Sequence, residues 1–199
     1  MLPIKAAVYE HLNQIIKHDL ATYMHCQRVA RLSFSIGQGL KLDRSVLNSL
    51  YYSALLHDLG KVSISKDVLN RVEKLTTLEW EIIHQHPVIG ASMIQNENEN
   101  TITKDIVAGI LTHHERWNGQ GYPSGLVGEN ISLFGRIISI ADALDAMTSA
   151  RPYRRQPLPF YEAVSEIQSL AGKQFDPYII RNVIISDYTS SAFWGLRVL

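Results

Sequence analysis

Apolar residues recur every three or four positions along almost the whole chain, which is the spacing of one buried face of an α-helix. Three amino-terminal stripes show it most clearly: Val8, Leu12, Ile15 and Ile16; Val29, Leu32, Ile36 and Leu40; Val46, Leu47, Leu50, Ala54 and Leu55. The same spacing predicts helices over about 77–86, 106–113, 133–147, 160–170 and 176–185. No stretch of useful length alternates as a β-strand does. We therefore expect an all-α fold.

The segments between these stripes differ in character. Pro87 ends one helix directly after His86, because proline cannot continue the helical hydrogen-bond pattern. Residues 96–100 form a polar loop, whereas residues 117–128 are rich in glycine and predict an ordered loop. Residues 187–199 are apolar without a clear period and pack either on the core or on a partner. A length of 199 residues fits one domain over 1–199.

Composition narrows the class of protein. Lys plus Arg and Asp plus Glu both number 19, so the net charge of zero gives no reason to expect duplex nucleic acid as a partner. The one cysteine, Cys26, excludes an intrachain disulfide and predicts a small buried residue. The start of the chain lacks signal-peptide character, and no apolar run approaches the ~20 residues that cross a bilayer. We expect a cytoplasmic protein without membrane association.

Histidine and aspartate residues lie at the ends or inner faces of the apolar helices. His57 and Asp58 close one such helix, where a buried carboxylate is costly unless it is paired or binds a metal. Asp142 similarly interrupts an apolar run. Any one of these residues alone would more commonly be a hydrogen-bonded core or surface residue. The complete set predicts a metal centre: His25, His57, Asp58, His86, His113, His114 and Asp142.

The types of ligand indicate the metal and the chemistry. Imidazoles combined with carboxylates suit Mn, Fe, Zn or Ni better than Mg or Ca. The two oxygens of Asp58 can bridge two cations ~3.5–4 Å apart, an arrangement used to hydrolyse phosphate esters. His11, His18 and His84 lie on faces that we expect to be exposed, and we assign them no role.

Several ordered motifs resemble one family. They are His57-Asp58-Leu59-Gly60-Lys61, His86-Pro87, His113-His114-Glu115, Gly121-Tyr122-Pro123, Ile140-Ala141-Asp142 and residues 148–154. Together they resemble the HD-GYP family of cyclic di-GMP phosphodiesterases over about residues 19–180. The resemblance implies a compact helical bundle of the HD-domain type. It also implies hydrolysis of cyclic di-GMP to linear pGpG, and onward to GMP, by a metal-activated bridging hydroxide.

The resemblance also implies roles for single residues. His25, His57, Asp58 and Asp142 match the ligands of one metal, and Asp58, His86, His113 and His114 match those of the second. Lys61 matches a lysine that contacts the substrate phosphate. The positions that match further substrate contacts are Tyr122, Asp145, Arg151 and Arg154. Without the resemblance, Lys61 would be a solvated residue at a helix end, and Tyr122 could equally anchor the loop by packing.

Two positions depart from the family pattern. Ala21 stands where some members have a glutamate that helps to hold a third metal, so we expect two divalent ions, Fe or Mn before Zn or Ni. Asn118 replaces an aspartate that usually precedes the loop glycine. Asn-Gly supports the same kind of turn, but the lost charge could weaken affinity or turnover.

Two other readings stay open at this stage. The same site could hydrolyse another cyclic dinucleotide, such as cyclic GMP-AMP, or a different nucleotide phosphoester. Alternatively, the chain could be a catalytically weak module that binds a cyclic dinucleotide, for which Asn118 is the main support. The complete set of metal ligands favours an enzyme. Its expected partners are the cyclic dinucleotide and a separate regulatory protein or a second copy of the chain.

Overall fold

The computed structural model describes residues 4–95, 101–150 and 156–184. Within these ranges the chain folds into helices, and the two β-type pairings are the isolated bridges Asn118–Val127 and Ala171–Phe175. The expectation of an all-α fold is therefore confirmed. No described helix combines the length and the apolar character needed to span a membrane. The polar loop at 96–100 and the tail at 187–199 lie outside the described residues.

The amino-terminal half contains most of the elements that carry the histidines. In chain order these are α1 (Ile4–His18), α2 (Leu20–Gly39), α3 (Arg44–Leu56), the 3-10 helix η1 (Leu59–Ser63), α4 (Lys66–Leu69), α5 (Thr77–His84) and α6 (His86–Gln95). The carboxy-terminal half continues with α7 (Thr101–Thr112), the 3-10 turn η2 (Gly128–Asn130), α8 (Leu133–Thr148), α9 (Phe160–Ser169), α10 (Pro177–Ile179) and the π-helical turn η3 (Ile180–Ile184). Apolar spacing did not predict η1, α4 or α6. Pro87, which was expected to end a helix directly after His86, instead lies in the first turn of α6, where its missing N–H is tolerated.

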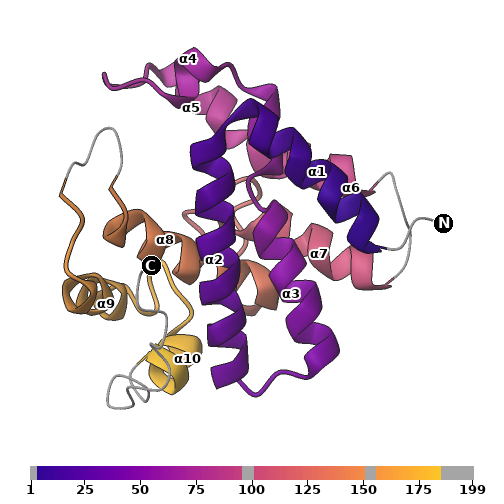
Figure 1. Ribbon diagram of the computed structural model, residues 1–199. Coiled ribbons are helices and arrows are strands. Elements are labelled where there is room, and N and C mark those ends of the chain that lie inside the picture. The colour runs from indigo at the N-terminus through magenta and orange to yellow at the C-terminus, as the bar shows by residue number, and fades with distance from the viewer. Residues whose placement is uncertain (1–3, 96–100, 151–155, 185–199) are drawn as a thin grey trace.

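Helix α2 runs through the middle of the molecule and packs against α3 on one side and α8 on another (Figure 1). Helix α7 packs against α3, α6 and α8. The core between them is aliphatic and includes Leu50, Ile110, Ile137, Ile138 and Ile140, each fully buried. This core fixes the ends of α3 and α7 next to the middle of α2 and α8.

One prediction for α1 is wrong. His11 was expected on an exposed face, but it is buried, with 5% of its surface accessible. His11 shares a helical face with Val8 and Ile15, which are buried, because residues three and four apart lie on the same side. Ile16, which the apolar stripe included, is instead 38% exposed.

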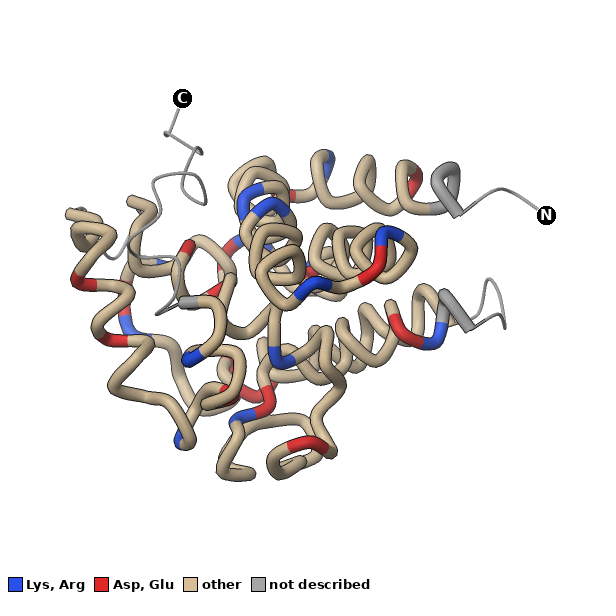
Figure 2. The backbone as a smooth tube through the Cα atoms, turned by 90° about the horizontal axis from the view of Figure 1, so that it is seen from below, with Lys and Arg blue, Asp and Glu red and all other residues tan. Residues whose placement is uncertain are grey.

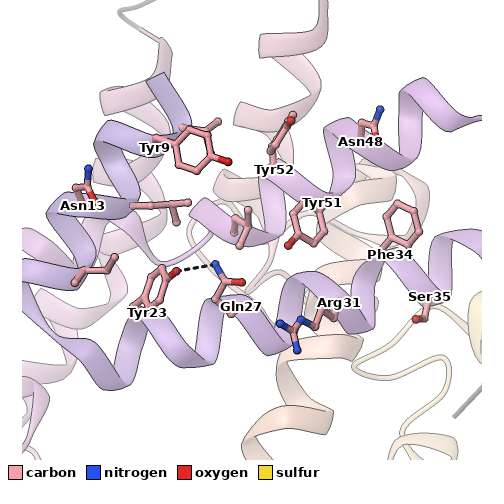
Figure 3. Close-up of a pocket in the computed structure, with 14 residues that line it drawn as sticks. Tyr9, Asn13, Tyr23, Gln27, Arg31, Phe34, Ser35, Asn48, Tyr51 and Tyr52 are labelled. Carbon is pink, nitrogen blue, oxygen red and sulfur yellow. Dashed lines mark hydrogen bonds between the residues drawn. The ribbon is translucent and has the colours of Figure 1, made fainter. Parts of the chain in front are cut away.

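Acidic and basic residues are interspersed over the described backbone, and Figure 2 shows no continuous basic stripe in that view. A cleft of about 810 Å³ lies between α1, α2 and α3 (Figure 3). Its walls carry several aromatic side chains, among them Tyr23, Phe34, Tyr51 and Tyr52. None of the seven predicted metal ligands lines this cleft, so the cleft and the histidine cluster are separate features.

Candidate metal centre

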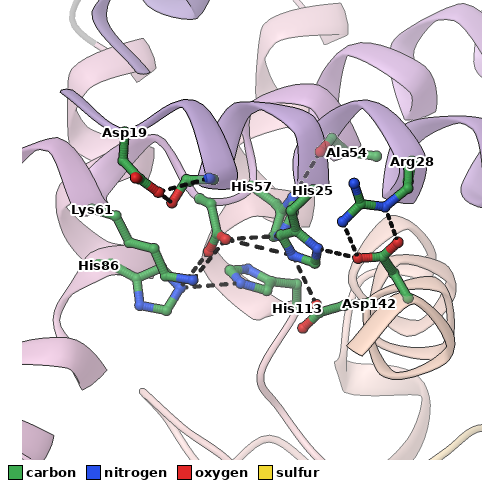
Figure 4. A network of polar contacts seen from close by, with 12 residues as sticks. Asp19, His25, Arg28, Ala54, His57, Lys61, His86, His113 and Asp142 are labelled. Atoms are coloured by element: carbon green, nitrogen blue, oxygen red, sulfur yellow. Dashed lines mark hydrogen bonds and ion pairs between the residues drawn. The ribbon is translucent and has the colours of Figure 1, made fainter. Parts of the chain in front are cut away.

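All seven predicted ligands meet in one place, although they come from five parts of the chain. Figure 4 labels five of them: His25, His57, His86, His113 and Asp142. His25 lies within α2, and Asp142 lies within α8. The other five lie at or just beyond helix ends: His57, Asp58, His86, His113 and His114. The carboxy-terminal ends of α3 and α7 thus face the cluster, and the negative end of a helix dipole favours bound cations.

A close approach of two backbones brings Asp58 next to His86. A Cβ atom on Gly60 would lie 2.0 Å from the carbonyl oxygen of His86 and 2.8 Å from the nitrogen of Gly90. Only glycine lets the backbone of η1 lie this close to the start of α6. The glycine of the His-Asp-Leu-Gly-Lys motif therefore acts through packing.

Asp58 stands at the centre of the cluster and is 1% exposed. Its Oδ1 lies 3.2 Å from His86 Nε2, and its Oδ2 lies 3.5 Å from His57 Nε2 and 3.7 Å from His25 Nε2. Burial raises the pKa of this carboxyl, but the Lys61 ammonium and the histidines outweigh that effect and hold the pKa well below its usual range. Asp58 is therefore an anion, with His86 Nε2 near one carboxylate oxygen and the Nε2 atoms of His57 and His25 near the other.

Three of the histidines are oriented by backbone carbonyls three residues earlier. The Nδ1 atoms of His57, His86 and His113 lie 2.7, 2.6 and 2.6 Å from the carbonyl oxygens of Ala54, Ile83 and Ile110. A carbonyl oxygen only accepts, so each Nδ1 carries the hydrogen and each Nε2 presents a lone pair when the ring is neutral. Metal-binding histidines commonly have this second hydrogen bond.

The Nε2 lone pairs of these rings are available to bind a cation. The buried Nε2 of His57 has no hydrogen-bond partner, and the Nε2 atoms of His86 and His113 lie only 3.3 Å apart. Two lone pairs at that distance repel each other unless a hydrogen or a cation lies between them. Burial lowers the pKa of His57 and of His113, and it lowers the pKa of His114 to about 3. These rings are neutral at neutral pH, which is the form that binds a metal.

The ligand atoms fall into two groups that share one residue. Atoms of Asp58, His86, His113 and His114 lie within 4.8 Å of one another, and so do atoms of His25, His57 and Asp58. Asp142 extends the second group, because its Oδ1 lies 3.1 Å from His25 Nε2. Either group could hold a divalent metal, so the donor set fits the ions that the sequence predicts.

Lys61 lies one turn beyond Asp58 and points back toward it. Its Nζ lies 2.7 Å from Asp58 Oδ2, and its side chain is 21% exposed. Burial lowers the pKa of Lys61, but the Asp58 carboxylate outweighs burial and raises it. The ammonium is therefore charged and adjacent to the ligand groups.

The glycine-rich loop is fastened to the cluster by Glu115, a residue to which sequence reasoning assigned no role. Its buried carboxylate accepts hydrogen bonds from the backbone N–H groups of Ser124 (2.7 Å) and Leu126 (3.1 Å). A Cβ atom on Gly121 would lie 2.3 Å from the nitrogen of Arg116, so the loop also needs glycine at its closest approach. The prediction of an ordered loop is confirmed.

Tyr122 is enclosed by two imidazole rings. Its ring stacks on His84 and on His114, with centroid distances of 4.1 and 4.8 Å and interplanar angles of 26° and 25°. Its backbone N–H also donates to the carbonyl of His114. These contacts favour the loop-anchoring interpretation of Tyr122. They also give His84 a structural contact that its sequence position did not indicate.

The remaining predicted substrate contacts have different outcomes. Arg151 and Arg154 lie outside the described residues. Asp145 is 2% exposed, and its carboxylate contacts His25 and Arg28, which sequence reasoning did not single out. The pattern of a histidine and an arginine three residues apart on one helix is the signal that could have found Arg28.

The chain belongs to the HD domain family, whose model matches residues 10–179. The curated relatives place it in the HD-GYP type that the motifs resemble, since several of them are cyclic di-GMP phosphodiesterases. One, from Thermotoga maritima, is 39% identical over 175 residues, which cover 87% of this chain and 47% of that protein.

Other similar proteins have a different named substrate. A 3′3′-cGAMP-specific phosphodiesterase of Vibrio cholerae is 32% identical over 178 residues, covering 88% of this chain and 33% of that protein. The crystal structure of a cyclic GMP-AMP-specific phosphodiesterase of V. cholerae superposes with a TM-score of 0.63 at 24% identity, covering 85% of this chain and 45% of that one. This likeness shows a shared fold. The chain spans half or less of the length of these relatives.

Proposed function

We propose that this chain is a metal-dependent phosphodiesterase that hydrolyses cyclic di-GMP to linear pGpG, with a second cut to GMP. The observation that carries the proposal is the position of Asp58, whose carboxylate belongs to both groups of ligand atoms. A carboxylate shared in this way suits two ions held side by side, which is the arrangement for in-line displacement at phosphorus. Membership of the HD family and the named activities of the relatives support the same reaction.

The proposed centre holds two ions, Fe or Mn, one in each ligand group. Ala21 is exposed and offers no ligand atom toward a third. The nearest carboxylate along the helix, Asp19, instead caps α2 and accepts a hydrogen bond from the Thr22 N–H at 2.7 Å. Two ions therefore use the available ligands of the described cluster.

The chemistry divides between the ions and the side chains. Divalent ions bound here supply Lewis-acid activation of water and neutralise charge on the phosphoryl oxygens. Lys61 provides a second positive charge beside Asp58 and contacts a non-bridging oxygen of the phosphate as negative charge develops on it. Tyr122 holds the loop against His114, so that the loop forms one wall of the substrate site. Arg151 and Arg154 are proposed to contact the phosphates or guanine edges.

The test compares metal content and hydrolysis for the wild type and Asp58→Ala. The wild type, loaded with Mn or with Fe under anaerobic conditions, should bind two ions per chain and convert cyclic di-GMP to pGpG. Asp58→Ala should lose both ions and all measurable hydrolysis, since both groups share that residue. Asp176→Asn is the matched control, because Asp176 is also buried but pairs with Arg136. It should lose stability and keep both ions.

Three outcomes would overturn parts of the proposal. A loaded protein that binds cyclic di-GMP without cleaving it would be a sensor. Faster cleavage of 3′3′-cGAMP than of cyclic di-GMP would change the substrate, as the name of one relative suggests. Three ions per chain would refute the argument from Ala21.

A further inference from the structure

His25 differs from the other oriented histidines in its place on its helix. His57, His86 and His113 each follow the last turn of a helix, where carbonyl groups lack the N–H that would continue the helix. For His86 the cause is Pro87. In a continuous helix the carbonyl of Ile83 would accept a hydrogen bond from the N–H of residue 87, but proline has no N–H, so this carbonyl is left for His86. These rings are oriented by spare carbonyls of their own helices.

His25 has no such carbonyl. It is the sixth residue of α2, which runs from Leu20 to Gly39, so the carbonyls one turn earlier accept from helical N–H groups. Its Nδ1 instead donates to Asp145 Oδ2 at 2.6 Å, on the neighbouring helix α8. The orientation of His25 therefore depends on how a side chain 120 positions away is held.

Arg28, one turn after His25 on α2, contacts both oxygens of the Asp145 carboxylate. Arg28 Nε donates to Oδ1 at 2.5 Å and Nη2 donates to Oδ2 at 3.0 Å, which forms a two-pronged contact. Ser149 Oγ donates to Oδ1 at 3.1 Å. Among the described residues, each oxygen of this buried carboxylate thus accepts two hydrogen bonds.

We propose that Arg28 is a positioning residue for the metal centre: through Asp145 it fixes the ring of His25, so that Nε2 faces Asp58 and Asp142. This inference rests on the proposed function for its metal, and it reassigns Asp145 from substrate contact to orientation of His25. It also makes the two ligand groups unequal. In the group with His86 and His113, both of these rings are oriented by backbone carbonyls. In the other group, a backbone carbonyl orients His57, whereas the orientation of His25 depends on two side chains.

The test measures metal binding by Arg28→Gln, Arg28→Lys and the wild type, using Mn titration followed by calorimetry and by elemental analysis of the purified protein. Arg28→Gln should lower the affinity for one of the two ions by about 10- to 100-fold, which is the usual effect of losing a group that orients a ligand. The affinity for the other ion should stay unchanged. Arg28→Lys keeps the charge but not the fork, so it should recover part of the loss. Arg31→Gln is the matched control, since Arg31 lies one turn further along α2 at the aromatic cleft.

Ring NMR supplies a readout that does not depend on activity. In the wild type loaded with Zn, the His25 Nδ1–H should give a slowly exchanging signal, and this signal should be lost or broadened in Arg28→Gln. An equal loss of affinity for both ions would overturn the inference and make Arg28 a structural residue. Unchanged Mn affinity with a raised KM would also overturn it and make Arg28 a substrate-binding residue. Wild-type protein that binds two ions without cleaving any cyclic dinucleotide would refute the proposed function alone.

Discussion

The fastening of the glycine-rich loop by Glu115 yields a prediction whose size follows from the structure. The carboxylate is 2% exposed and accepts two backbone N–H groups, from Ser124 and Leu126. Glu115→Gln keeps the shape of the side chain but offers one carbonyl oxygen, so its NH₂ group faces one of the two donors. Leaving a buried donor without an acceptor costs about 1–3 kcal/mol of folding free energy. For a chain of this size that lowers Tm by roughly 2–12 °C, at about 2–4 °C per kcal/mol.

Hydrogen exchange and thermal unfolding measure this effect together. The amides of Ser124 and Leu126 should exchange faster in Glu115→Gln, while amides in the core of α3 keep their protection. Glu129→Gln makes the same chemical change at an exposed position beyond the same loop and should change stability by less than about 0.5 kcal/mol. If Glu115→Gln left both amides as protected as in the wild type, the carboxylate would not be what holds the loop.

Three further predictions concern other parts of the molecule. Gly60→Ala places a Cβ 2.0 Å from the carbonyl oxygen of His86. This variant should lower the unfolding free energy measured by chemical denaturation by at least about 1–3 kcal/mol, and it should bind less metal. Normal metal content would contradict the packing role of Gly60. Asn118→Asp should leave stability and turnover close to wild type. The exposed Asn118 side-chain oxygen already accepts a hydrogen bond from the Gln120 N–H at 3.1 Å, as an aspartate oxygen would. A large gain in kcat would show that the missing charge matters. Burial raises the pKa of Tyr51, so its contribution to stability is present below pH 10 and is lost as the pH rises through the higher folded value. Tyr51→Phe should therefore flatten the fall in unfolding free energy between pH 9 and 11, and an unchanged slope would refute this assignment.

The sequence alone determined the class of fold and the identity of the histidines and aspartates that the structure clusters. Apolar spacing is a local property, so the stripe through Leu47 and Leu50 was enough to define α3. The ligands His57, His86 and His113 were recognisable because each follows an apolar helix at a breaking residue or at its natural end. Their orientation is also local, since the carbonyl that each ring uses lies three residues earlier.

Only the tertiary structure decided which side chains hold the ligands and the loop in place. The family resemblance matched Asp145 to a substrate contact, and only the structure shows that Arg28 reaches its carboxylate from a helix 117 residues earlier. The same holds for the stacking of His84 on Tyr122. The candidate site was thus predictable where a residue and its hydrogen-bond partner share a helix end. The contacts of His25 and Arg28 with Asp145 were not predictable, because they form where α2 packs against α8. A pattern along one chain segment carries no information about the segment that packs on it.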